Sequence, residues 1–231
     1  LARAGVARRP DSVSLRPRWW AAGASIALLV LGARAGWAQR SAEEAILPLA
    51  AYQSQDALAL ARSYRTELRA LYQSVRRCAP ELDFHPHGLG FRRPLGADGS
   101  PPYLATWVWI PSEPPLSGDG IGARSAEAFR RYAPKLLPLL VAREGLHADS
   151  RIGGYGLLLT WIKPQGGTPP IGETLVVFLP KSAVTPFVAG TTTFGELLRE
   201  AQTRVFDGQT EVDFIRLEIP DWEVPLRPPR C

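Results

Sequence analysis

The amino-acid sequence predicts an α+β fold, namely a ferredoxin-like βαββαβ antiparallel sandwich preceded by a long amphipathic helix. Three observations lead to this prediction. A helical stripe of apolar residues occupies 49–77, and four β-prone runs alternate with helical segments between 103 and 219. In chain order, residues 103–219 read β-α-β-β-α-β, which is the order of a split βαβ sandwich. The length of 231 residues accommodates one such domain with appendages.

The N-terminal segment has the features of an export signal. Residues 1–18 hold five arginines and one aspartate, and the apolar run 19–33 is shorter than the roughly 20 residues of a membrane-spanning helix. Residues 36–38 (Gly-Trp-Ala) then form a small-x-small cleavage pattern. We expect 1–38 to be a signal peptide, with an uncleaved anchor in 19–33 as the alternative. Either interpretation predicts an extracytoplasmic protein, periplasmic or secreted, that meets the membrane only through this segment.

The net charge of the chain belongs to the same segment. The formal charge is +5, and Arg supplies 24 of the 27 basic residues, which favours a GC-rich bacterial source. Residues 1–38 contain six of these arginines and a single Asp, so 39–231 has 21 basic and 21 acidic side chains. A nucleic-acid-binding domain needs a basic surplus. The composition therefore argues against a nucleic-acid partner.

Residues 39–80 are expected to form a helical segment. The sequence from Ser41 to Glu44 is a capping-box pattern, and Pro48 should kink or restart the helix. From 49 to 77, apolar residues then recur every three or four positions over about eight turns. These residues are Ala57, Ala61, Tyr64, Leu68, Leu71 and Val75. This stripe packs on the following domain or, alternatively, binds a partner helix.

Residues 81–220 are expected to form the sandwich. The runs 103–110, 155–162, 173–179 and 212–219 are rich in β-branched, aromatic and aliphatic residues, which is typical of strands. A helix should follow Ser125, and Pro134 and Pro138 should divide it into two short pieces. A second capping box at Thr193 predicts a helix that extends to about Phe206. Residues 221–231 form a Pro-rich tail that we expect to be irregular.

One short segment offers candidate metal ligands. Asp83, His85 and His87 stand at alternate positions, so in an extended segment all three side chains would project from one face toward a Zn or Cu ion. Three ligands so close along one strand rarely converge on one ion, and the sequence offers no distant fourth ligand. The competing interpretation is a solvated segment that leads into a turn. No resident cofactor is expected.

Three other features are candidate sites. Cys78 and Cys231 can form a disulfide after export. Arg92 and Arg93 form a basic pair that suits an anionic group, although most such pairs are simply solvated. Trp107, Trp109 and Trp161 lie on predicted strands and, with Tyr103 and Tyr155, form either an aromatic binding platform or part of the core.

These features favour a binding protein over an enzyme, because no motif identifies a reaction and no nucleophile elbow is present. The sequence predicts an exported, non-enzymatic interaction or accessory protein that binds a protein or envelope component through the 49–77 helix or the sheet. The alternative is a small extracytoplasmic metal-binding protein or enzyme that uses Asp83, His85 and His87.

Overall fold

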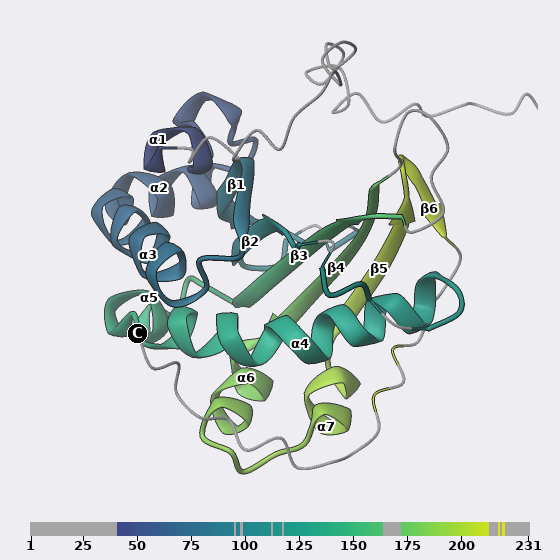
Figure 1. Cartoon of the computed structure of the whole chain (residues 1–231). Coiled ribbons are helices and arrows are strands. Elements are labelled where there is room, and N and C mark those ends of the chain that lie inside the picture. Colours follow the sequence, from purple (N-terminus) through teal and green to yellow (C-terminus); the bar gives the residue numbers. More distant parts are fainter. Residues whose placement is uncertain are drawn as a thin grey trace, which may run out of the picture. The chain divides into compact units, whose positions relative to one another are not determined.

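The computed structural model describes residues 41–163 and 172–212, apart from 95, 98, 112 and 117, together with Leu217 and Ile219. In this part of the chain, six strands form one mixed sheet whose spatial order follows the chain order (Figure 1). They are β1 (Asp83–Arg92), β2 (Tyr103–Trp109), β3 (Gly154–Ile162), β4 (Gly172–Pro180), β5 (Gln202–Asp207) and β6 (Thr210–Val212). The α+β class is confirmed.

The ferredoxin-like topology is not confirmed. In a split βαβ unit a further strand separates the two parallel strands. Here β2 and β3 are parallel and directly hydrogen bonded, in a register that runs from Tyr103–Gly154 to Trp109–Thr160. Every other neighbouring pair is antiparallel. The prediction of four strands fails because it omits β1 and β5 from the sheet.

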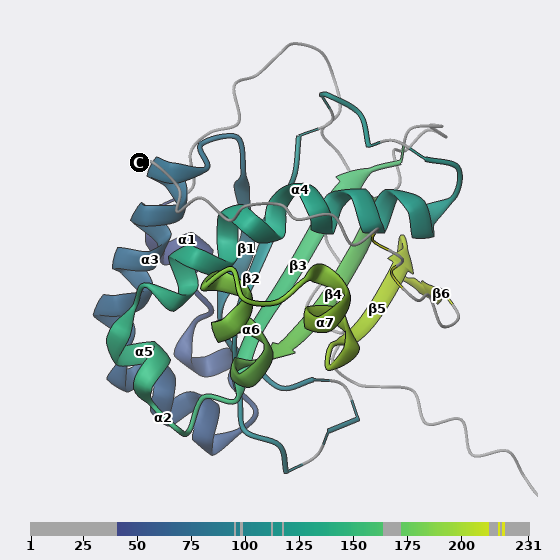
Figure 2. The ribbon, with the colours of Figure 1, turned by 90° about the horizontal axis from the view of Figure 1, so that it is seen from below.

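The helices that connect the strands cover one face of the sheet. Parallel neighbours need a long crossover, and α4 (Ile121–Val141) and α5 (Glu144–Ala148) form the one between β2 and β3. α6 (Lys181–Val188) and α7 (Phe194–Arg199) connect β4 to β5. Figure 2 shows α4, α6 and α7 in front of the strands, and α4 and α6 both contact β3 and β4. The main hydrophobic core lies between these layers.

The prediction that α4 is two short pieces is wrong. α4 is a continuous 21-residue helix that contains both Pro134 and Pro138. Each proline removes one backbone donor from the helix. Both proline side chains are partly exposed, whereas Phe129, Leu136 and Leu140 are buried against the core. Burial of this long apolar face outweighs the two missing hydrogen bonds.

The predicted eight-turn helix is divided into two helices. Ser41 caps α1 (Ala42–Ala45) with the expected capping box, and a 3-10 turn (Leu49–Ala51) follows Pro48. α2 (Gln55–Ser63) and α3 (Arg65–Cys78) then meet at Tyr64, whose φ of −111° and ψ of 24° are not helical. Apart from the half-buried Tyr64, the predicted apolar stripe is buried in the main core. These helices therefore pack on the sheet domain through their apolar face.

The C-terminal boundaries differ from the prediction. Thr193 caps α7 with the expected capping box, but α7 ends at Arg199, and Gln202–Asp207 is a strand. Val205 follows the helical spacing of the preceding apolar residues, yet it is buried on β5. A strand was predicted at 212–219, and of this run the structure describes three residues. Val212 is the last residue of β6, and Leu217 and Ile219 are buried. Residues 1–38, 221–231 and the rest of that run lie outside the described residues.

No helix in the described ranges combines the length and the hydropathy needed to cross a bilayer.

The close approach of β3 to its neighbours generates a stability prediction. A Cβ on Gly154 would overlap the carbonyl oxygen of Leu179 and lie 2.6 Å from the Tyr103 ring. We expect Gly154→Ala to lower the free energy of unfolding by about 3 kcal/mol or more, because backbone cannot move aside. Urea denaturation measures this loss.

The matched control is Gly145→Ala in α5, where the nearest atom is 4.0 Å from the added Cβ. Alanine favours helix by up to about 1 kcal/mol over glycine, so this variant should be as stable as the wild type or slightly more so. Equal urea midpoints for the two variants would contradict the assigned β3–β4 contact.

Candidate functional site

Strand alternation creates a second sheet face opposite the helical layer. Successive side chains of a strand point to opposite faces, and four buried residues form a cluster separate from the main core. This cluster consists of Ala105, Leu158, Val176 and Phe178, with Tyr103, Trp107 and Phe206 packed against it. In the described part of the chain no helix contributes a side chain to the cluster. We call these residues, with Trp109, Ile162 and His85, the second face.

Aromatic rings gather at one end of the second face. The imidazole of His85 stacks on Trp107, with ring centroids 3.7 Å apart and planes 3° apart. The centroid of Trp109 lies 6.0 Å from that of His85. The Trp109 ring also extends across β3, where its outer carbons lie 3.6 and 3.7 Å from the Cβ position of Gly172. A Cβ at residue 172 would therefore be in ordinary van der Waals contact with the indole.

A short chain of hydrogen bonds connects the Trp107 indole to the neighbouring strands. Trp107 Nε1 donates to Thr160 Oγ1 at 2.8 Å, and the hydroxyls of Thr160 and Thr174 are 2.9 Å apart. These residues lie on β2, β3 and β4, so the chain crosses three strands. Ile162 is at the same end of the face, opposite Gly172, with 36% of its surface exposed. The result is a partly exposed apolar surface on a fixed framework.

The third tryptophan of the predicted platform lies on the other face. Trp161 is buried in the main core, and its Nε1 donates to Glu173 Oε2 at 2.6 Å. Tyr155 is likewise buried on the helical side. Trp161 and Tyr155 therefore belong to the main core, whereas Trp107, Trp109 and Tyr103 lie on the second face, where a binding platform stays a prediction.

Glu173 is the centre of a buried ion pair that the sequence analysis missed. Its carboxylate is fully buried and accepts two hydrogen bonds from Arg124 of α4, at 2.8 and 2.5 Å. The hydrogen bond to this carboxylate is the main cause that raises the pKa of Arg124. With Trp161 as a third donor, the pair fastens the first turn of α4 to β3 and β4.

The three candidate metal ligands are not brought together. β1 is extended at this position, but a register irregularity interrupts it, and His87 has a φ of 58°. The simple alternation of Asp83, His85 and His87 is therefore lost. Asp83 lies 3.8 Å from Arg76 of α3, and His85 stacks on Trp107. Among the described residues, no group of three or more His, Cys, Asp or Glu side chains is placed to hold a metal ion.

The arginine pair does not form a common anion site. Arg92 donates to the backbone oxygen of His87 at 2.8 Å, and burial lowers its pKa. Arg93 instead pairs with Asp56 of α2 at 2.7 Å. Each guanidinium thus has its own structural partner.

Cys78 ends α3 and is not a free thiol. Its predicted partner, Cys231, lies outside the described residues, so the pairing stays a prediction.

The sequence analysis also missed a polar network beside α5. His147 Nδ1 and the Tyr155 hydroxyl are 2.6 Å apart, and Tyr64 donates to Asp149 Oδ2 at 2.8 Å. Lys181 donates to backbone oxygens at the end of α5, including those of His147 and Asp149, both at 2.7 Å. Burial, followed by the charge of Lys181, lowers the pKa of His147. Hydrogen bonds from Arg151 hold the pKa of Asp149 well below its usual range.

The comparisons with known proteins give no relative: no family model, no curated protein and no solved structure matches the chain.

The Arg124–Glu173 pair generates a stability prediction. Arg124→Met leaves a buried carboxylate without its counterion, so we expect a loss of about 3–5 kcal/mol in the free energy of unfolding. Arg124→Met/Glu173→Gln removes the charge and keeps an acceptor for Trp161. Urea denaturation should show that the double variant is more stable than Arg124→Met alone. If the double variant were less stable than Arg124→Met, an unpaired buried charge on Glu173 could not be the cause of the stability loss in Arg124→Met.

The His147 environment predicts acid sensitivity. Because the pKa of His147 is lower in the folded protein than its ordinary value near 6.5, the unfolded chain binds the proton first as pH falls. The stability contributed by the neutral imidazole is present above about pH 6.5 and is lost as pH falls through the lowered folded value. His147→Gln should lose less stability than the wild type between pH 7.5 and 5, as measured by urea midpoints. Equal losses would contradict this role.

Proposed function

We propose that the chain is an exported bacterial protein of non-enzymatic, accessory type, and that its second face binds a protein or envelope component. The observation that carries this proposal is the partly exposed aromatic group formed by Trp107, Trp109 and His85, together with Ile162. Contiguous apolar side chains on a sheet face that no described helix covers are typical of interaction sites. Aromatic side chains on fixed strands also lose little conformational entropy on binding.

The second face is favoured over the 49–77 helices as the partner site. The apolar stripe of α2 and α3 is already buried in the main core, so it is not free to receive a partner helix. On the second face, by contrast, Trp107 and Trp109 are both partly exposed. Export is supported by the sequence of 1–38, with its Arg-rich start, its apolar run and its small-x-small pattern.

Photo-crosslinking in whole cells tests the proposal. A photoreactive phenylalanine analogue replaces Ile162 on the second face or, as the matched control, Leu49, which is 40% exposed but lies on the 3-10 turn. We expect one discrete adduct from position 162, none of that mass from position 49, and loss of the adduct with Trp109→Ala. Protease added to spheroplasts should also digest the protein while sparing a cytoplasmic marker.

Identical adducts from both positions, or an adduct that persists with Trp109→Ala, would exclude the second face as the binding site. Protection from protease in spheroplasts would exclude export.

A further inference from the structure

Five arginines lie on α2 and α3. At about 100° per residue around a helix, the four on α3 fall within an arc of about 120°, and Glu67 lies about 140° from its centre, whereas the fifth lies on α2, beyond the non-helical Tyr64. They are Arg62, Arg65, Arg69, Arg76 and Arg77, and we call them the arginine face. Their grouping on two consecutive helices makes this part of the surface cationic.

The arginine face has more positive charge than its neighbours neutralise. Glu43 of α1 pairs with both Arg65 and Arg69, and Asp83 lies 3.8 Å from Arg76. Arg62 and Arg77 are exposed and form no ion pair with any described residue. Five arginines against two carboxylates leave an excess of three positive charges. Because 39–231 as a whole has equal numbers of basic and acidic side chains, this excess is local.

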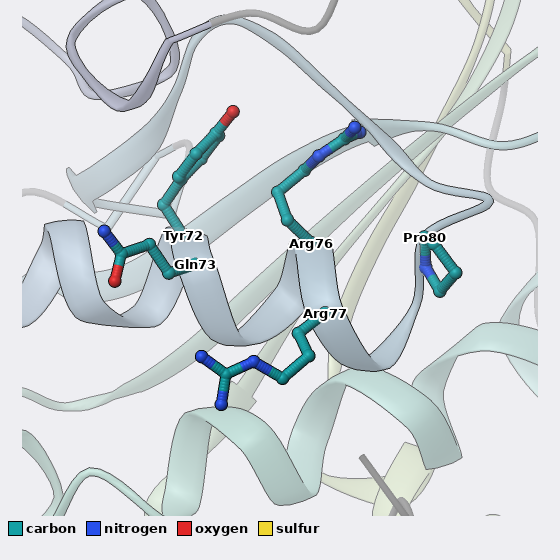
Figure 3. A pocket seen from close by; sticks show the side chains of 5 residues that line it. All are labelled: Tyr72, Gln73, Arg76, Arg77 and Pro80. Carbon is teal, nitrogen blue, oxygen red and sulfur yellow. The ribbon is translucent and has the colours of Figure 1, made fainter.

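The C-terminal part of the arginine face adjoins an open hollow of about 360 Å³ (Figure 3). Tyr72, Gln73, Arg76, Arg77 and Pro80 line it. Figure 3 shows the Arg76 and Arg77 side chains extending to opposite sides of α3, so one guanidinium group lies on each side of this helix. Arg76 donates to the backbone oxygen of Leu82 at 3.1 Å, which fixes its position. Guanidinium groups bind phosphate oxygens through paired N–H donors.

We propose that the arginine face docks on a membrane surface by binding the phosphate groups of anionic lipids. Charge complementarity is the first reason, since clustered Lys and Arg side chains are attracted to anionic lipid surfaces. The second is position: the ion pairs of Glu43 with Arg65 and Arg69 place residue 43 on this face. The apolar run 19–33 lies only about ten residues before it in the sequence. This surface is separate from the second face, so the proposal does not depend on the proposed function.

Vesicle sedimentation tests the proposal. The full-length protein is mixed with vesicles of phosphatidylcholine alone, or with about a quarter phosphatidylglycerol. The readout is the difference in bound protein between the two vesicle types. The Arg-rich residues 1–18 contribute equally to this difference in every variant, so the contribution of the arginine face is the change between the wild type and a variant. We expect the wild type to prefer the anionic vesicles and to lose this preference at high salt. Arg62→Gln/Arg77→Gln should reduce the preference about threefold or more.

The matched control is Arg199→Glu, which changes the net charge by the same amount at an exposed position on α7. It should keep the wild-type preference. Equal binding of the wild type to both vesicle types, or an equal loss in both variants, would overturn the proposal. If the wild type shows no preference for the anionic vesicles but binds polyglutamate through Arg62 and Arg77, the arginine face binds an acidic protein, and the lipid assignment is wrong.

Discussion

The pairing of β3 is the constraint on which the rest of the structure depends. This strand is parallel to β2 and antiparallel to β4, and its side chains are buried on both faces up to Trp161. Leu157, Leu159 and Trp161 enter the main core, while Leu158 belongs to the cluster of the second face. A slip of one residue would exchange the two sets. The indole of Trp161 would leave Glu173, and Thr160 would leave Trp107.

Local signals predicted the parts of the fold that depend on local physics. β2, β3 and β4 were predicted because each is a continuous β-prone run between turn residues, and the capping boxes at Ser41 and Thr193 need only four residues each. The failures lie where tertiary burial overrides local preference. Two prolines in α4 argue for a break, but the sheet stabilises the whole helix. Val205 fits a helical spacing, but its place is set by pairing with β4 and β6.

The candidate site was only partly predictable for a related reason. Trp107 and Trp109 could be placed on a strand, but only the β2–β3 register shows that they share a face with Thr160 rather than with Trp161. Pro86 indicates a disturbed backbone beside His87, but neither the register shift between Phe84 and Leu89 nor the left-handed conformation of His87 could be predicted from it. The network around α5 joins Tyr64 to Asp149 and Lys181 to His147, contacts that span many residues and leave no periodic signal.

The two prolines of α4 also have a kinetic consequence. A helix that lacks two internal donors is a poor helix in isolation, because each proline costs about 3 kcal/mol relative to alanine. α4 therefore gains its stability from the sheet, and the parallel β2–β3 pairing must wait for the same crossover. The β3–β4 hairpin has the shorter sequence separation and can form first.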